Sequence, residues 1–321
     1  MKFDKPRVIV LSRNYSTGLG VIRSLGEAGY TVDLVASVKK RGSSIIASSS
    51  KYVQNSYEIL SKKIQGDDGQ EIIQLLMNYA EKNEEKMVLF PSDDFTTSVI
   101  DKHRSVLEPY FYMPGTKKEN VSITTLMDKS FQSDVAKVAG VLIPAEWRIS
   151  LRDTIVIPQD MIYPCFVKPL QSFSGHKTEM TVCENEAELR NHLMDMKSFY
   201  DDRDVLVQEF LKIDKEYDLS GVCDDQQIMI PAIIEKTNIS QHERGVTMSG
   251  VLLPTDILGE AFPHIQMLLK EFRYTGMFDM ELNLCGDKLY FNEVNLRSGG
   301  PNYAYYLSGV NLPNIFVKAL L

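Results

Sequence analysis

Cysteines are few and widely separated, and no C-x-x-C pair occurs among Cys165, Cys183, Cys223 and Cys285. This spacing predicts neither a zinc site nor a disulfide framework, and it indicates small buried apolar residues. The sequence also lacks a low-complexity segment, an obvious internal repeat and any apolar run near the roughly 20 residues of a membrane span. We therefore expect a cytoplasmic globular protein without a membrane segment.

Basic residues are in deficit, because 35 Lys and Arg stand against 43 Asp and Glu, which gives a net charge of −8 and a pI near 5.3. Nucleic acids are held by clustered Lys and Arg that release counterions, so this balance argues against a general nucleic-acid binder. Any phosphate ligand must be met by local basic groups. The 321 residues, 44% of them hydrophobic, can form two or three domains or subdomains.

Three common signatures are missing or incomplete. No G-x-S-x-G occurs, and no cysteine has a His partner nearby in sequence, so a covalent acyl-enzyme has no visible carrier. The glycines of residues 12–20 invite a dinucleotide interpretation, but Arg23 replaces the third glycine and Ala36-Ser37 replaces the acidic ribose ligand. There is no Walker loop either. A dinucleotide-dependent oxidoreductase is therefore the weaker hypothesis.

The N-terminal part of the chain alternates strand and helix patterns. Apolar strand segments occupy 7–12, 31–36 and 87–92, and helical segments occupy 18–28 and 70–81. This alternation predicts a parallel sheet with helices on its faces. A small ligand would lie at the carboxyl edge of that sheet, near Pro91-Ser92-Asp93-Asp94. An equally good interpretation makes Asp93 only the N-cap of the next helix.

Residues 276–301, GMFDMELNLCGDKLYFNEVNLRSGGP, form the most informative segment. Apolar and polar side chains alternate over 278–283, as in a strand with one buried face. Gly286-Asp287 then supplies a hairpin turn. On the returning strand, the period of two predicts one shared face for Leu289, Phe291, Glu293 and Asn295.

The predicted hairpin would gather acidic and amide side chains. Folding at the turn brings Glu281 close to Glu293, with Asn295 and Arg297 just beyond. Oxygen ligands of this kind, with positive charge beside them, suit a Mg²⁺ ion shared with substrate phosphates. A solvated hairpin face is the simpler explanation for two isolated glutamates, but four converging polar groups favour the metal site.

In the middle part of the chain, lysines and polar residues lie at the ends of predicted helices and strands. Met127-Asp128-Lys129 opens a predicted helix through Val138, which Gly140 can end in a left-handed conformation. A strand over 163–169 carries Lys168 at its end, and the loop 171–177 that follows could cradle phosphates with its backbone amides. The next strand turns polar at Gln208-Glu209.

Several of these motifs follow one another in a fixed order: Asp128-Lys129, Lys168, Gln208-Glu209, Glu281 and finally Glu293-Val294-Asn295-Leu296-Arg297. Together they resemble the ATP-grasp carboxylate-amine ligases over nearly the whole chain. The resemblance implies a parallel α/β N-terminal domain at 1–114, as precedes the grasp in biotin carboxylase. It implies a two-subdomain α+β ATP-grasp fold at 115–321. Within that fold, the nucleotide-covering subdomain would span about 127–207 and the metal-binding subdomain about 208–321.

The resemblance also implies roles for individual residues. Lys129 and Lys168 would hold the phosphates of ATP under a covering loop that contains Ser172, Ser174 and Gly175. The adenine would lie along Gln208, Glu209, Phe210 and Leu211, and Glu216 would hold the ribose. The ligands of Mg²⁺, or alternatively Mn²⁺, would be Glu281, Glu293 and Asn295. The transferred phosphoryl group would face Lys236, Arg297 and Arg244.

The implied function is an ATP-dependent ligase that activates a carboxylate as an acyl-phosphate and joins it to an amine. The partners would be small-molecule substrates, such as an amino acid or small metabolite, with no nucleic acid and no membrane; a homodimer stays open. The tail Ser298-Gly299-Gly300 is most similar to ligases related to D-aspartate ligase. The alternatives are a purine-pathway or carbamoyl-phosphate synthase-like enzyme and a catalytically silent ATP-binding regulatory protein. Because the sequence stops within an apolar helix over 312–321, it leaves open whether a further segment follows.

Overall fold

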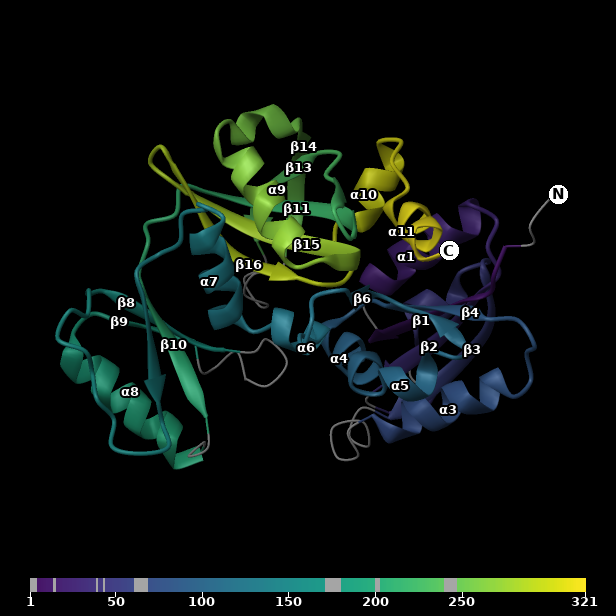
Figure 1. The fold of residues 1–321 in the computed structure, drawn as a ribbon, viewed down its shortest axis with the longest axis horizontal. Helices are drawn as coiled ribbons and strands as arrows, with labels where there is room; N and C mark the ends of the chain where they lie inside the picture. Colours follow the sequence, from purple (N-terminus) through teal and green to yellow (C-terminus); the bar gives the residue numbers. More distant parts are fainter. Residues whose placement is uncertain are drawn as a thin grey trace.

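The computed structural model describes residues 5–13, 16–38, 40–42, 44–60, 69–170, 180–199, 203–239 and 247–321. Three sheets follow one another along the molecule. A parallel sheet lies at one end, a seven-stranded sheet in the middle, and a four-stranded sheet with one covering helix at the other end (Figure 1). The predicted architecture, a parallel α/β domain followed by two further α+β units, is confirmed.

The N-terminal sheet is parallel and has the strand order β3-β2-β1-β4-β5. Its strands are β1 (Val8–Arg13), β2 (Val32–Val38), β3 (Val53–Leu60), β4 (Met87–Pro91) and β5 (Phe111–Tyr112). Its helices are α1 (Ser16–Glu27), α3 (Gln70–Ala80), α4 (Asp94–Lys102) and α5 (Arg104–Leu107), with a 3-10 turn η1 (Ile46–Ser49). The order reverses between β1 and β4, and in open α/β sheets ligands typically bind at the carboxyl ends of the strands at such a position.

The edge strand β3 was not predicted from the sequence. Its sequence, VQNSYEIL, exposes three consecutive side chains, so it carries no apolar run. Polar edge strands are typical of sheets that avoid pairing with other chains, and periodicity alone does not reveal them.

The middle sheet has the order β14-β13-β11-β15-β16, with β12 paired to β11 and β6 paired to β15. Its strands are β6 (Gly115–Thr116), β11 (Lys215–Asp224), β12 (Gln227–Met229), β13 (Ile233–Ile239), β14 (Thr247–Leu253), β15 (Tyr274–Cys285) and β16 (Lys288–Asn295). Cys285 pairs with Lys288, and Gly286 has φ +63°, so the predicted two-residue turn at Gly286-Asp287 is confirmed.

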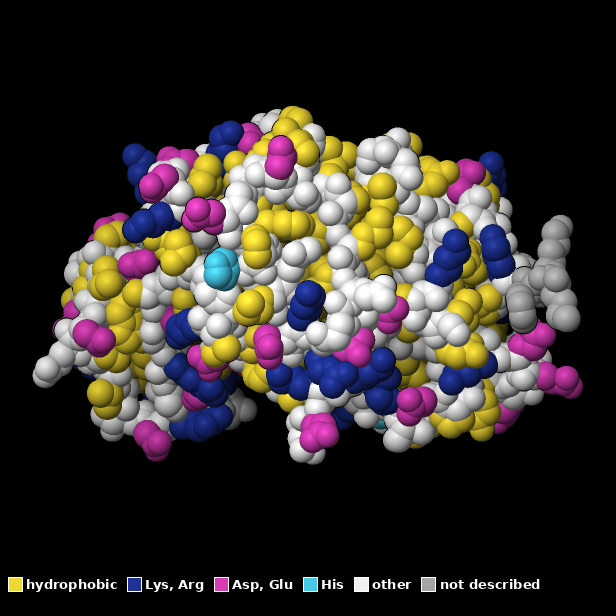
Figure 2. Space-filling model, turned by 45° about the horizontal axis from the view of Figure 1, so that its top comes forward, with side chains coloured by type: hydrophobic (Ala, Val, Ile, Leu, Met, Phe, Trp, Pro, Cys, Tyr) yellow, Lys and Arg dark blue, Asp and Glu magenta, His cyan; other side chains and the backbone are white. Residues whose placement is uncertain are grey.

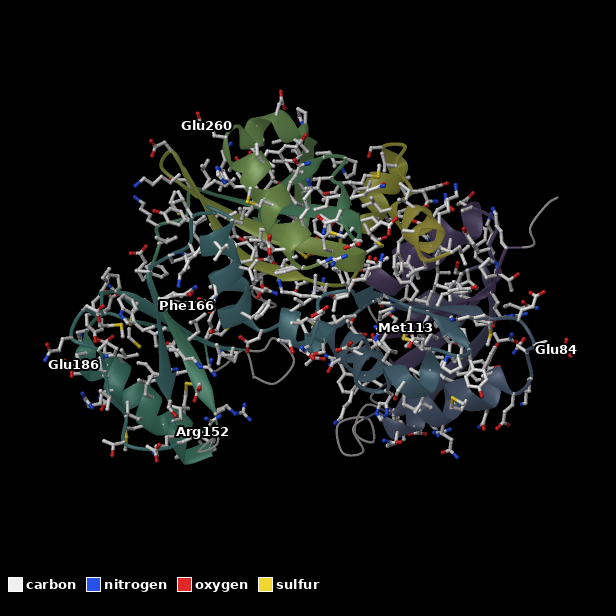
Figure 3. The ribbon with its side chains drawn as sticks, viewed as in Figure 1. Glu84, Met113, Arg152, Phe166, Glu186 and Glu260 are labelled. Atoms are coloured by element: carbon white, nitrogen blue, oxygen red, sulfur yellow. The ribbon has the colours of Figure 1, made fainter. Side chains whose placement is uncertain are left out.

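Helices cover both faces of the middle sheet. One face packs against α6 (Ile123–Leu126), α7 (Lys129–Val138), a 3-10 turn η3 (Thr255–Leu258) and α9 (Ala261–Glu271), around a core that includes Phe278 and Phe291. The other face packs against α10 (Asn302–Leu307) and α11 (Leu312–Leu320). Phe316 of α11 also meets Phe90 of β4 edge to face at 5.1 Å. The C-terminal helices therefore join the middle sheet to the N-terminal domain in one continuous core. Met113, labelled in Figure 3, lies in a separate core of the N-terminal domain that includes Leu76 and Ile100.

The small sheet has the order β7-β10-β8-β9. Its strands are β7 (Glu146–Ser150), β8 (Cys165–Pro169), β9 (Thr181–Cys183) and β10 (Asp204–Glu209), and α8 (Glu186–Phe199) covers it. Phe166 marks β8 in Figure 3. Cys165, Cys183 and Cys223 are buried, as predicted, Cys285 is partly buried, and all four are free thiols in this structure.

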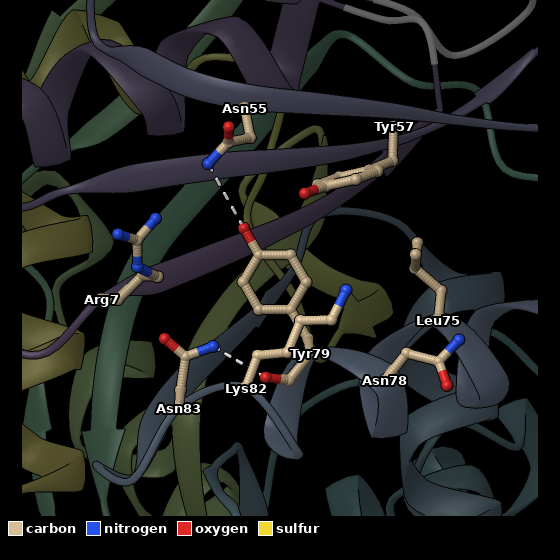
Figure 4. A pocket seen from close by; sticks show the side chains of 8 residues that line it. All are labelled: Arg7, Asn55, Tyr57, Leu75, Asn78, Tyr79, Lys82 and Asn83. Atoms are coloured by element: carbon tan, nitrogen blue, oxygen red, sulfur yellow. Dashed lines mark hydrogen bonds between the residues drawn. The ribbon is translucent and has the colours of Figure 1, made fainter.

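A shallow cavity of about 340 Å³ lies at the amino edge of the parallel sheet, where Arg7, Asn55 and Tyr79 meet (Figure 4). Behind it, Asp33 is fully buried and accepts hydrogen bonds from Arg7 at 2.6 Å, from the Asn55 amides at 2.9 and 3.0 Å, and from Tyr79. These polar groups therefore satisfy one another, and the cluster stabilises the strand ends.

The outer surface is mixed in character. On the face shown in Figure 2, side chains of both charge signs lie among hydrophobic ones. Across the described ranges, no helix has both the length and the apolar character needed to cross a membrane.

Candidate functional site

The β15–β16 hairpin places four polar side chains on one face. Glu281 pairs with Glu293, and Asp279 pairs with Asn295, and directly paired residues of antiparallel strands point to the same side. The predicted approach of the two glutamates is therefore confirmed. Each glutamate side chain is about one-fifth exposed, so the pair lies at a partly buried surface.

The predicted common face of Leu289, Phe291, Glu293 and Asn295 is wrong. Leu282 pairs with Phe291 and Glu281 with Glu293, so Asn292 is an extra residue in a β-bulge. Phe291 and Val294 both enter the core at 2% exposure. One inserted residue shifts the two-residue period by one, which turns Glu293 and Asn295 away from the core and toward Glu281.

Lys236 of β13 lies at the centre of the acidic residues. Its Nζ is 3.0 Å from Asp218, 3.4 Å from Glu216 and 3.5 Å from Glu281, and its side chain is 1% exposed. Burial by itself would lower the pKa of Lys236, but the charges of Glu281, Asp218 and Glu216 outweigh burial and raise it. Lys236 is therefore a permanent cation that links β11, β13 and β15.

The two paired glutamates have pKa values displaced in opposite directions. Burial, and next the negative charge of Glu293, raises the pKa of Glu281 to about 7. Burial would also raise the pKa of Glu293, but Lys129 and Lys168 outweigh it and hold this pKa at about 2. Glu281 is therefore short of positive charge, and a further cation beside it would be stabilised.

Two lysines reach this face from the other side. Lys129 is the first residue of α7, which Asp128 caps by accepting the Phe131 amide at 3.0 Å, and it forms an ion pair with Glu293. Lys168 of β8 is 3% exposed and donates to Asn292 Oδ1 at 3.3 Å. Burial, followed by repulsion from Lys129, lowers the pKa of Lys168 to about 7. Lys129 and Lys168 thus bring positive charge from α7 and β8 to the hairpin face of the middle sheet.

Arg297 connects the hairpin to the N-terminal domain. Its Nε is 3.0 Å from Asp94, the first residue of α4, and its Nη1 is 3.6 Å from Asp279. Burial would lower the pKa of Arg297, but Asp94 and Asp279 raise it. Asp93 accepts the Thr96 amide at 3.0 Å, so its predicted role as N-cap is confirmed.

The predicted adenine residues lie at the end of β10 and just after it. The Gln208 side chain donates to Glu146 at 3.1 Å, and Phe210 donates its amide to Pro164 O at 2.9 Å. No hydrogen bond or ion pair between described residues joins Gln208, Glu209, Phe210 or Leu211 to the charged side chains of the hairpin face. The Leu211 amide has no protein acceptor in the described part of the chain, so it is open to a ligand. Ser172, Ser174, Gly175 and Arg244 lie outside the described residues.

A magnesium site fits the donors on the hairpin face. Within the described ranges, no three His, Cys, Asp or Glu side chains form an all-protein metal cage. Glu281, Glu293 and Asn295 instead offer two carboxylates and an amide on one face. Such an incomplete oxygen set is typical of Mg²⁺, which fills its remaining positions with water and phosphate oxygens.

Sequence reasoning missed four residues that the structure places in or beside the site: Asn292, Asp218, Asp279 and Asp94. Asp218 is two positions from Glu216 and pairs with Glu281, so the period of two on β11 could have revealed it. Asp279 belongs to the same polar row as Glu281. Asn292 reached the site through the bulge and had no local signal. Asp94 belongs to the expected ligand edge at 91–94, but its contact with Arg297 arises from tertiary packing.

Part of the chain is similar in sequence to curated proteins. A carbamoyl phosphate synthase large chain from Pseudomonas syringae pv. tomato is 28% identical over 139 residues, which are 42% of this chain and 13% of that protein. One from Lachnoclostridium phytofermentans is 21% identical over 212 residues, 64% of this chain and 19% of that protein. The chain therefore spans only a small part of the curated relatives it matches.

Solved structures match almost the entire chain. An L-amino acid ligase from Bacillus licheniformis superposes with a TM-score of 0.66 at 14% identity, over 99% of this chain and 75% of that chain. The biotin carboxylase domain of Hydrogenobacter thermophilus 2-oxoglutarate carboxylase, solved with MgADP, gives 0.71 at 19% identity, over 98% and 69%. These likenesses confirm the predicted fold. A family model for the ATP-grasp domain matches residues 135–300, more than half of the sequence, and the chain accordingly belongs to the ATP-grasp family.

Proposed function

We propose that this protein is an ATP-dependent ligase that activates a carboxylate as an acyl-phosphate and joins it to an amine, releasing ADP and phosphate. The observation that carries the proposal is the convergence of four basic side chains on the hairpin face that holds Glu281 and Glu293. Lys129 pairs with Glu293 and Lys236 with Glu281. Lys168 donates a hydrogen bond to Asn292, and Arg297 pairs with Asp279. A carboxylate that attacks a phosphate brings two anions together, so concentrated positive charge lowers the barrier. The L-amino acid ligase among the structural neighbours supports this reaction class.

The nucleotide would lie between the small and middle sheets. Lys129 and Lys168 would hold its phosphates, the open Leu211 amide would donate to the adenine edge, and Glu216 would accept from the ribose hydroxyls. Mg²⁺ held by Glu281, Glu293 and Asn295 would neutralise phosphate charge as a Lewis acid. The neighbour solved with MgADP supports both cofactors.

The chemistry needs no nucleophile from the protein. The substrate carboxylate oxygen forms a bond to the terminal phosphorus as the bond to ADP breaks, with Arg297 and Lys236 holding the moving phosphoryl group. The amine nitrogen then attacks the acyl carbon, and phosphate leaves. Ordered binding of both substrates limits hydrolysis of the intermediate by water.

The acyl-phosphate can be trapped chemically. A screen of ADP release over amino acids, small carboxylates and bicarbonate, each paired with amines or ammonia, identifies the carboxylate. With that carboxylate, Mg-ATP and hydroxylamine, we expect a hydroxamate together with ADP and phosphate. AMP and pyrophosphate would instead indicate an acyl-adenylate and overturn the proposal.

A carbamoyl-phosphate synthase-like activity is the second candidate, because the two curated relatives described above carry that name. The same screen separates the two. ADP release that needs bicarbonate and ammonia, and no organic carboxylate, would favour the second candidate.

Lys168→Ala should weaken the binding of ATP at least tenfold and change the binding of adenosine little, since a buried ammonium contacts phosphate as a point charge. Isothermal titration of both ligands measures the difference. Lys197→Ala, in α8 of the same small-sheet unit, is the control and should bind both ligands normally. Equal losses for ATP and adenosine would place Lys168 elsewhere.

The lowered pKa of Lys168 adds a pH dependence. At pH 8 the free side chain is mostly neutral, because its pKa is about 7. Phosphate favours the charged form, so ATP binding should take up a proton at pH 8 and less at pH 6. Titrations in buffers with different ionisation enthalpies measure this uptake, which Lys168→Ala should remove.

A further inference from the structure

The guanidinium of Arg297 is held through two of its three nitrogens, Nε and Nη1. Its Nε is 3.0 Å from Asp94 Oδ1, and its Nη1 donates to Ser298 O at 3.1 Å and lies 3.6 Å from Asp279 Oδ2. Among the described residues, no hydrogen bond or ion pair is formed through Nη2. Because the guanidinium is planar, fixing Nε and Nη1 also fixes the direction in which Nη2 can donate.

Asp94 is the nearer of the two carboxylates and comes from a different domain. It is the first residue of α4, and the preceding Asp93 fixes that turn by accepting the amides of Thr96 at 3.0 Å and Arg13 at 3.1 Å. The side chains of Asp94 and Arg297 are each 19% exposed, so water screens their attraction only partly. Asp279 is more distant from Arg297 and is also engaged by Ser220 Oγ at 2.6 Å.

We propose that Asp94 is a positioning residue for phosphoryl transfer: it orients Arg297 across the domain boundary, so the N-terminal domain takes part in forming the reactive site. This inference rests on the proposed function, in which Arg297 faces the transferred phosphoryl group. The simpler alternative is that Asp94 only docks the two domains. That alternative predicts a loss of stability without a selective effect on the phosphoryl site.

MgADP with fluoroaluminate, a mimic of the transferring phosphoryl group, tests the proposal without a known substrate. In the full chain, fluoroaluminate should tighten MgADP binding, and Arg297→Lys should reduce this gain. Asp94→Asn should reduce the gain roughly tenfold, as expected for loss of a charged hydrogen bond, while affinity for MgADP alone stays within about twofold. With substrates from the screen, Asp94→Asn should lower kcat and leave the KM for ATP nearly unchanged.

Asp101→Asn is the matched control. Asp101 also belongs to α4 and also crosses the boundary, because it accepts from the Thr124 amide at 2.9 Å and its hydroxyl at 3.0 Å. A normal fluoroaluminate gain in Asp94→Asn would overturn the proposal. Equal losses in Asp94→Asn and Asp101→Asn, or a parallel loss of MgADP affinity, would also overturn it and indicate domain docking. If Asp94→Asn is insoluble, Asp94→Ser is judged by the same outcomes.

A failure of the proposed function has a different signature. Wild-type protein would then bind MgADP without any gain from fluoroaluminate, and Arg297→Lys would behave like the wild type. The positioning role of Asp94 would fall with it. A gain in the wild type that depends on Arg297 but not on Asp94 would remove the positioning role alone.

Discussion

Glu293→Gln should abolish turnover while leaving the fold intact, with a loss of ADP release on the order of 100-fold or more. The substitution keeps the shape of the side chain and removes the negative charge that would hold Mg²⁺ against the phosphates. Stabilising the charge that develops in the transition state is usually the largest single contribution to the rate, so loss of the metal should have a large effect. Glu293 is buried, but the charges of Lys129 and Lys168 hold its pKa at about 2. The wild-type carboxylate therefore stays ionised from pH 5 to 9. The defect should therefore be constant over that range.

Glu235→Gln provides the comparison for this variant. Glu235 lies next to Lys236 on β13 but pairs with Lys215 at the surface, at 2.9 Å. We expect its ADP release to match the wild type. Unchanged ADP release in Glu293→Gln, with normal thermal unfolding in both variants, would remove Glu293 from the proposed metal site.

Lys236→Met should destabilise the protein by about 3–5 kcal/mol at pH 8, because it removes the shared partner of three acidic side chains. Asp218 is 3% exposed and 3.0 Å from Lys236, so its charge would be left buried without a counter-ion. Urea unfolding followed by circular dichroism measures the difference. A loss below about 1 kcal/mol would mean that the acidic residues rearrange or take up protons without cost.

The cost of Lys236→Met should shrink as the pH falls. In the wild type, burial and Glu293 already raise the pKa of Glu281 to about 7, and burial and Asp218 raise that of Asp279 to about 6. A carboxyl with a raised folded-state pKa contributes stability that is present below its unfolded pKa and is lost as the pH rises through the folded value. Removing Lys236 raises these pKa values further, so the variant should lose most stability above pH 7 and least near pH 5.

Lys215→Met is the control for this second variant. Lys215 pairs with Glu235 on the face of β11 opposite to Glu216 and Asp218, and its side chain is half exposed. Surface ion pairs of this kind contribute little, so the unfolding midpoint should barely move at any pH. A pH-dependent loss as large as that of Lys236→Met would show that general surface charge, rather than the buried cluster, controls stability.

Local sequence patterns predicted the helix caps and turns whose contacts lie within a few positions of one another in the chain. Asp128 caps α7, Gly140 has φ +78° after that helix, and Gly286 supports the hairpin turn, and all three were expected from residues within a few positions. Strand β3 escaped prediction because its polar sequence carries no burial signal. The bulge at Asn292 escaped because an extra residue in one strand is defined only by its pairing partner.

The sequence by itself determined the strand–helix alternation of the N-terminal sheet, the hairpin and the two glutamates that meet across it, since short-range periodicity and turn chemistry encode these features. The tertiary structure alone decided which charges share space. Asp218 and Lys236 come together through strand pairing, Lys168 meets Asn292 between two sheets, and Arg297 meets Asp94 across a domain boundary. These contacts join residues up to 203 positions apart, and their pKa shifts arise from burial and from partners that no local window of sequence contains.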